Sequence, residues 1–328
     1  MQRNYTLDIM RIVAIVCVVI CHSSGSLIFH HQVDPGSSWF LQCVALNGIT
    51  RWDVPFFVML TGFFMLDPNK LVPVKTLYSK NLLRIFAALV FWSLFYGLTL
   101  HRPLYPLGSQ EGHLWYLGMI IGVYIAIPVL RLIAQNQTVL KYFSLAWVVV
   151  MCYQFIGCFV TLPVDLNKMI FVDFAGYVVF AYYIRTLFHN RPETSRLRKT
   201  SHVIYILGLI GFIFTIAMGL LTQDEETYFY KFTSPNVLIT ATALLVFSIR
   251  HPLHPTGKLA AFIENCSKCT FGIYLIHVWV LAHILNRIHR FIPQPILMTI
   301  VCVVAAFLIS YAITFILKKI PFVQKYLV

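Results

Sequence analysis

Three ionisable residues share one face of an apolar stretch near the start of the chain. Asp8, Arg11 and His22 lie within DIMRIVAIVCVVICHSSG, which is otherwise mostly apolar. Three helical turns separate Arg11 from His22, so both side chains point the same way, about 16 Å apart along the axis. An ionisable side chain at bilayer depth costs about 2.5–3.5 kcal/mol, so it indicates a functional site by default. An imidazole, with an ordinary pKa near ~6.5, can take and return a proton. The open alternative is that Asp8 and Arg11 only meet the lipid headgroups and that His22 is satisfied within a bundle.

Two pairs of charged residues lie at the ends of later apolar stretches. Arg51 and Asp53, in TRWDVPFFVMLTGFF, are expected at about the depth of His22. They belong either to the site or to an ion pair at the membrane interface. Lys80 and Arg84 are four residues apart, which places them on one face of an α-helix. They either bind phosphate groups or anchor the helix at the cytoplasmic surface.

Two further stretches combine histidine with aromatic residues. His113, Trp115 and Tyr116 lie in GHLWYLG, and Tyr274 and His277 lie in TFGIYLIH. Aromatic rings can pack on the apolar faces of a sugar while an imidazole bonds its hydroxyls. Trp115 and Tyr116 also fit an aromatic belt at the membrane surface, which does not explain His113. His277 is expected near the midplane, where a lone histidine is often only a packing residue.

The composition is that of a helical membrane protein. The 328 residues are 59% hydrophobic and 11% charged, against about 25% charged in soluble domains. Mean hydropathy is +0.77. Apolar runs of about 20 residues recur along the chain, and no alternating pattern of a β-barrel is present. The sequence therefore predicts an all-α, polytopic bundle in a lipid bilayer.

About ten transmembrane helices are expected, with both termini in the cytoplasm. The expected spans are 9–29, 39–66 with a bend near Pro55, 80–100, 113–131, 138–160, 169–189, 202–221, 232–249, 268–288 and 295–317. Most Lys and Arg residues then fall on the cytoplasmic side, as the positive-inside rule requires. Gly62 is expected to let a neighbouring helix approach closely. Residues 1–328 are expected to form one membrane domain without an appended soluble domain, so we expect chemistry to take place among the helices.

Composition also excludes several functions. The net charge of +13 is explained by basic residues in cytoplasmic loops, so no nucleic-acid partner is expected. Five of the eight cysteines lie inside apolar runs, where cysteine behaves as a small hydrophobe. Cys266 and Cys269 form one C-x-x-C without a second pair at zinc-ligand spacing. We therefore expect no metal.

Several short motifs, taken in order, resemble those of the membrane-bound acyltransferase-3 family. That family has Arg, ten intervening residues and His in its first span, as at Arg11 and His22. Its third span has Arg-x-x-x-Arg, and this chain departs from it with Lys80 before Arg84. Lysine keeps the charge but loses the bidentate fork that suits phosphate. The other matches are V-P-x-F-F after a basic residue (Arg51), H-L-W-[YF]-L at His113, and a late S-x-x-x-Y-x-x-H in which Thr270 replaces Ser.

The resemblance implies an O-acetyltransferase of the bacterial cytoplasmic (inner) membrane. Such enzymes move an acetyl or other acyl group from acyl-CoA on the cytoplasmic side to a hydroxyl of an envelope glycan. The acceptors include O-antigen of lipopolysaccharide, common antigen, exopolysaccharide and peptidoglycan precursors. The implied roles are catalysis by His22, Asp8 and Arg11, binding of the cosubstrate acetyl-CoA by Arg11, Lys80 and Arg84, and binding of the acceptor by Arg51, Asp53, His113, Trp115, Tyr116, Tyr274 and His277.

Several alternatives stay open. His22 is either a general base for a sugar hydroxyl or the carrier of a covalent acyl-imidazole. Asp8 is expected to pair with Arg11. A different class of function is a proton-coupled transporter or flippase of a glycan or small solute, although no sequence repeat relates the two halves. The acceptor sugar, the length of the acyl group, the face that presents the acceptor and the oligomeric state cannot be read from the residues.

Overall fold

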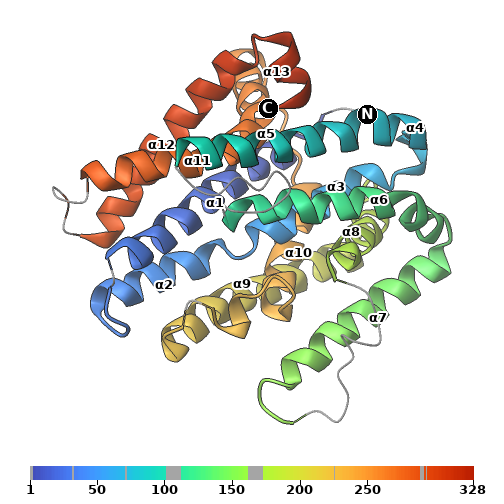
Figure 1. Cartoon of the computed structure of the whole chain (residues 1–328). Coiled ribbons are helices and arrows are strands. Elements are labelled where there is room, and N and C mark those ends of the chain that lie inside the picture. Colours follow the sequence, from blue (N-terminus) through green and yellow to red (C-terminus); the bar gives the residue numbers. More distant parts are fainter. Residues whose placement is uncertain are drawn as a thin grey trace.

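The computed structural model describes residues 3–31, 33–70, 72–100, 112–161, 173–224, 226–288, 292 and 294–328. Every regular element in these ranges is a helix (Figure 1). The long helices are α1 (Tyr5–His31), α2 (Ser38–Thr50), α3 (Asp53–Met65), α5 (Leu83–Thr99), α6 (Trp115–Gln135), α7 (Gln137–Ile156), α8 (Asp173–Phe188), α9 (Ser195–Thr222), α10 (Pro235–Arg250), α11 (Gly257–Ile288) and α12 (Pro295–Leu317). The short ones are η1 (Pro68–Lys70), α4 (Val74–Thr76), η2 (Leu77–Leu82), η3 (Gly112–Leu114), η5 (Tyr228–Tyr230) and α13 (Pro321–Tyr326).

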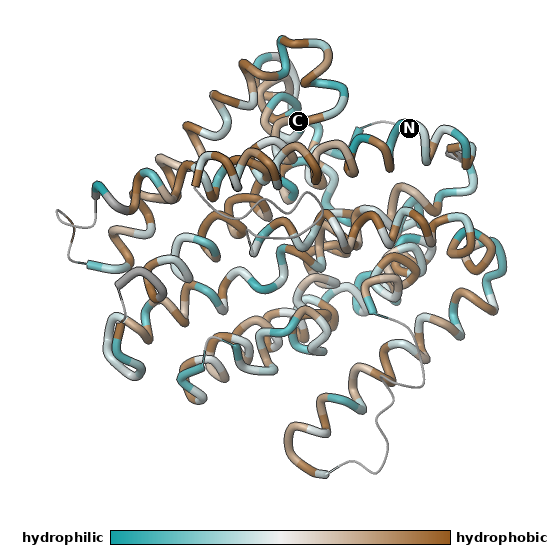
Figure 2. Tube along the Cα trace, viewed as in Figure 1, coloured by the Kyte–Doolittle hydropathy of each residue, from teal (hydrophilic) through white to brown (hydrophobic). Residues whose placement is uncertain are grey.

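The polytopic helical bundle expected from composition is confirmed. Eight helical segments in the described ranges are long and apolar enough to cross a membrane. Figure 2 shows these helices apolar along most of their length, with hydrophilic residues gathered toward their ends and connections. The predicted count of ten and the cytoplasmic location of both termini stay predictions.

The predicted span 39–66 is divided into two helices, α2 and α3, of 13 residues each. The helix is interrupted at Arg51 and Trp52, just before the predicted bend near Pro55. Pro55 lies in the first turn of α3, where backbone N–H groups have no partner within the helix and proline costs little. The break therefore belongs to the residues before the proline, and it places Arg51 and Asp53 at a helix junction.

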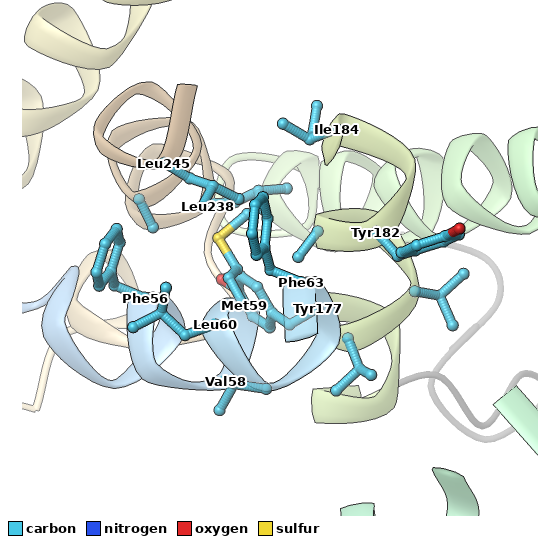
Figure 3. Close-up of a cluster of buried hydrophobic side chains, with 14 of the residues drawn as sticks. Phe56, Val58, Met59, Leu60, Phe63, Tyr177, Tyr182, Ile184, Leu238 and Leu245 are labelled. Carbon is cyan, nitrogen blue, oxygen red and sulfur yellow. The ribbon is translucent and has the colours of Figure 1, made fainter. Parts of the chain in front are cut away.

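Helix α1 lies at the centre of the bundle, packed against α2, α3, α10, α11 and α12. One apolar cluster fills the space between α3, α6, α8 and α10. Figure 3 shows its middle, where Phe56, Met59 and Phe63 of α3 meet Tyr177 of α8 and Leu238 of α10. A second cluster joins α1, α5, α11 and α12. Helix α1 contributes to both clusters, which fixes the helix that carries Arg11 and His22.

The close approach predicted at Gly62 is confirmed. A Cβ atom at this position would lie 2.0 Å from the carbonyl oxygen of Val178 on α8. Two turns further along α8, the buried Arg185 donates to the Phe63 carbonyl and, over 2.6 Å, to the Asp67 carboxylate. Helices α3 and α8 are thus held in backbone contact and closed at one end by a buried ion pair.

Candidate active site

The charged end of α1 is a hydrogen-bonded cluster. The buried Asp8 carboxylate accepts from Arg3 Nε and from Ser267 Oγ of α11, both at 2.6 Å. Arg11 Nη1 lies 3.3 Å from Asp8 Oδ1 and 3.3 Å from Ser267 Oγ. The predicted pairing of Asp8 with Arg11 is therefore present. Asp8 and Ser267 together orient the Arg11 guanidinium.

His22 meets two other histidines from different parts of the chain. The ring centroids of His22 and His277 are 5.1 Å apart, those of His113 and His277 5.3 Å, and those of His22 and His113 5.9 Å. His277 is fully buried and His113 is 2% exposed. The sequence singled out all three residues, but only the packing of α1, η3 and α11 brings them into one triangle.

Tyr274 organises two sides of this triangle. Its hydroxyl donates to the backbone carbonyl of His113, and its own carbonyl lies 2.7 Å from Nδ1 of His277. A carbonyl oxygen can only accept a hydrogen bond, so His277 Nδ1 carries a proton. In the neutral ring, Nε2 is then unprotonated, or bare. His277 Nε2 and both ring nitrogens of His113 are buried and lack a partner that meets hydrogen-bond geometry among the described residues.

Two cavities meet at His22 and His113. The wide cavity, of about 960 Å³, also reaches Asn47, Arg51 and Tyr230. The narrow cavity, of about 160 Å³, extends toward Arg11. His22, His113 and Trp115 line both. The rest of the narrow cavity is mostly apolar or aromatic, formed by Ile15, Val18, Val54, Phe57, Tyr116, Thr270, Phe271 and Tyr274.

The wall of the wide cavity combines aromatic faces with polar groups. Trp115 stacks on Phe232, with 5.6 Å between ring centroids and 19° between planes. The Arg51 guanidinium lies 4.8 Å from the ring centroid of Tyr230. Tyr230 is itself fixed by its hydroxyl, which donates to the Val44 carbonyl at 2.8 Å. Acidic side chains of Asp173 and Glu226 also border this cavity.

Three of the predicted catalytic and acceptor-binding residues lie beside the cavities instead of lining them. Asp8 orients Arg11, and His277 lies behind His22. Asp53 is buried, and its carboxylate accepts from the Val54 N–H at the start of α3. Asp53 and Arg51 do not form an ion pair in the described structure, because Arg51 turns toward the wide cavity.

The two basic residues of the third predicted span have different surroundings. Lys80 is exposed, whereas Arg84 is half-buried, donates to the Val328 carbonyl and lies 5.2 Å from the ring of Phe271. Lys80 lies in the π-helical turn Leu77–Leu82, and Arg84 lies in the first turn of α5. That they share one face stays a prediction. Neither side chain lines the two cavities. Arg84 adjoins the narrow cavity through Phe271.

Sequence reasoning missed three residues of the site. Ser267 lies one turn before Thr270 on α11 and completes the Asp8 cluster. Asn47 is 4% exposed, lies one turn before Arg51 on α2 and borders the wide cavity, with its Oδ1 3.6 Å from the Cys21 sulfur. A polar residue one turn from a residue of a recognised motif was the available signal for both. Tyr230 is the last residue of the short 3₁₀ helix η5, and nothing in its neighbourhood along the chain marks it.

Side chains that could bind a metal ion do not cluster in the part of the chain that the structure describes. No three or more His, Cys, Asp and Glu side chains there have an arrangement that could hold a metal ion.

Comparison with known proteins gives one family and one curated relative. A family profile described as an acyltransferase domain matches residues 4–315. A protein from Enterococcus faecalis named amino-acid racemase is 25% identical over 353 aligned positions, which cover 97% of this chain and 47% of that protein. This chain thus spans about half the length of that relative. No solved structure matches.

Proposed function

The chain belongs to the membrane-bound acyltransferase-3 family, and on this premise we propose that it moves an acetyl group from acetyl-CoA to a hydroxyl of a cell-envelope glycan. The chain is a multi-pass membrane acyltransferase. The donor, the acceptor and a location in the bacterial cytoplasmic membrane are our proposals. The Enterococcus relative's name belongs to a protein of about twice this length, and we infer no racemase activity from it.

The single observation that carries the proposal is the position of His22 at the junction of two unlike cavities. Acyl transfer needs two substrates whose reacting atoms meet at one proton carrier. A narrow apolar passage suits a thin, flexible thioester arm. A wide cavity with aromatic and polar walls suits a sugar. Among the described residues, the two cavities share a wall at His22, His113 and Trp115.

The donor would enter from the Arg11 end. Asp8 and Ser267 hold the Arg11 guanidinium, and its remaining donors can bind phosphate oxygens. From there the narrow cavity follows α1 toward His22, about 16 Å along the helix axis. An extended pantetheine arm can cover this distance. Arg84 adjoins the same end and exposed Lys80 lies further out, so we assign Arg84 the closer contact with the nucleotide.

The acceptor would occupy the wide cavity. Trp115 offers an aromatic face, and Arg51 and Asn47 offer hydrogen-bond donors close to His22. The volume of about 960 Å³ is at the upper end of ordinary ligand sites, about 300–1,000 Å³. It therefore suits an acceptor larger than one small metabolite, such as a sugar within a glycan.

His22 would act as the general base of the reaction. A bare ring nitrogen of His22 takes the proton of the sugar hydroxyl while the hydroxyl oxygen attacks the thioester carbonyl carbon. The C–S bond then breaks, and the departing thiolate takes the proton back from His22. Arg51 is the nearby cation that can stabilise negative charge on the carbonyl oxygen. A covalent acyl-imidazole at His22 is the alternative, and acid quenching of the enzyme with labelled donor would trap it.

The experiment is mass spectrometry of envelope glycans from cells with and without the gene, together with turnover of acetyl-CoA by the pure protein. We expect one glycan to lose an acetyl-sized increment and regain it on complementation. Unchanged glycans combined with no thioester turnover would refute the proposal.

A further inference from the structure

His277 is buried behind His22 and lines neither of the cavities proposed to hold the substrates. Its Nδ1 proton is committed to the Tyr274 carbonyl at 2.7 Å. The bare Nε2 is left without a donor in a fully buried place. A buried acceptor without a partner is costly, and such a group in a folded protein requires an explanation.

Two rings are close enough to supply that donor. With centroids 5.1 Å apart, a nitrogen of His22 can approach His277 Nε2 to about 3 Å, a hydrogen-bond distance. His113 is nearly as close, at 5.3 Å, but its ring also lies beside the Leu275 carbonyl. No hydrogen bond of good geometry joins them, so His113 has no partner of its own in the part of the chain that the structure describes. His22 likewise has no hydrogen-bond partner among the described residues, and we take its N–H as the donor because its ring is the closer of the two to His277.

We propose that His277 is a positioning residue that fixes which nitrogen of His22 carries the proton. The chain of bonds runs from His22 N–H to His277 Nε2, and from His277 Nδ1–H to the Tyr274 carbonyl. This inference rests on the general-base role proposed for His22. With one nitrogen of His22 bonded to His277, the other is bare and faces the junction of the cavities.

The proton balance of the reaction is unchanged by this arrangement. The bare nitrogen of His22 accepts the proton of the acceptor hydroxyl, and the ring becomes an imidazolium whose second N–H still bonds His277. The same proton leaves with the thiolate when the C–S bond breaks. His277 gives and takes no proton. It orients the ring and stabilises the imidazolium, as the orienting member of a catalytic triad does.

Three variants of His277 separate this role from packing. His277→Gln keeps an amide oxygen near the position of Nε2, where it can accept from His22. His277→Asn keeps a donor near the position of Nδ1, for Tyr274, but falls short of His22. His277→Phe keeps the ring and removes both bonds. The matched control is His283→Phe, because His283 also lies on α11 and its Nδ1 makes the same kind of backbone bond, 2.8 Å to Trp279.

The first measurement does not depend on activity. Protein labelled with ¹⁵N-histidine is placed in lipid nanodiscs, and the resonances lost in His22→Gln are assigned to His22. We expect His22 to be a single tautomer, with the same ring nitrogen protonated in every molecule, in the unsubstituted protein, in His277→Gln and in His283→Phe. We expect mixed tautomers in His277→Asn and His277→Phe. An unchanged His22 tautomer in His277→Phe, or a change confined to His113, would overturn the proposal.

The second measurement is cleavage of acetyl-CoA by the same samples, with the affinity for acetyl-CoA measured alongside. We expect kcat to fall about 10–100-fold in His277→Asn and His277→Phe, as for other orienting partners, with KM for acetyl-CoA unchanged. His277→Gln should recover most of this loss. A loss of equal size in His277→Gln and His277→Phe would contradict the positioning role. If the tautomers change as expected but no sample cleaves acetyl-CoA, the proposed function fails and the positioning of His22 stands.

Discussion

Substitution of Gly62 by alanine should loosen the contact between α3 and α8. The added Cβ would lie 2.0 Å from the Val178 carbonyl oxygen and 2.7 Å from its carbonyl carbon. Ordinary contacts between such atoms are about 3.5 Å. The obstacle is backbone, which cannot rotate away as a side chain can. The two helices must therefore separate by about 1 Å or more, and the bonds from Arg185 to Phe63 and Asp67 lie within two turns of the strain.

The expected cost is at the upper end of the range for overpacked cores, about 2–3 kcal/mol. The matched control is Gly122→Ala on α6, because nothing lies within 4 Å of a Cβ built there. Alanine at an open helix position is favoured over glycine by about 0.5–1 kcal/mol. The two substitutions make the same chemical change and should have effects of opposite sign.

The assay is thermal unfolding in lipid nanodiscs, followed by tryptophan fluorescence. We expect the midpoint of Gly62→Ala to fall by roughly 5 °C and that of Gly122→Ala to stay level or rise slightly. Equal midpoints for Gly62→Ala and the unsubstituted protein would refute the close approach of α3 and α8. A fall as large in Gly122→Ala would show that the loss is not specific to this contact.

Three other substitutions test the site and its frame. Ser267→Ala removes one of the two bonds that hold Arg11, so the Kd for acetyl-CoA should rise about tenfold, and a change below twofold in equilibrium binding would contradict this role. Trp115→Ala should raise KM for the glycan acceptor about tenfold with donor affinity unchanged, and a selective loss of donor binding would argue against the assignment. Asp67→Asn leaves Arg185 buried without its counter-ion and should cost about 3–5 kcal/mol of unfolding free energy, measured by thermal unfolding at pH 7.

The unfolding free energy lost in Asp67→Asn should also depend on pH. Burial alone would raise the pKa of this carboxyl, but hydrogen bonds from Asn69 and Arg185 outweigh it, so the pKa lies below the ordinary value. A lowered pKa contributes stability above the ordinary value of about 3.9, and this stability is lost as pH falls through the folded pKa. The difference between the unsubstituted protein and Asp67→Asn should therefore shrink in acid, and a difference that is constant with pH would contradict the ion pair.

Much of the fold follows from the apolar runs, because a run of about 20 such residues must cross the bilayer as a helix. The spacing of Asp8, Arg11 and His22 also survives folding, because one helix holds all three. The π-helical turn Leu77–Leu82, which contains Lys80, could not be predicted, because the local sequence carries no clear signal of such a turn.

The site itself could be predicted only residue by residue. Periodicity within one helix indicates which side chains share a face, but not which faces of different helices meet. The approach of His113 and His277 to His22 depends on how η3 and α11 pack against α1. Ser267 and Asn47 are ordinary polar residues until that packing places them beside Arg11 and Arg51.

The most direct test of the central claim is acyl transfer by His22→Gln. Glutamine keeps polarity and approximate size but cannot take and return a proton near neutral pH. Transfer of labelled acetyl from acetyl-CoA to the glycan is measured per folded molecule, with donor affinity alongside. We predict a loss of about 10²–10⁴-fold with donor affinity unchanged, because general-base catalysis contributes that much. Activity within about tenfold of the unsubstituted protein would contradict the role of His22.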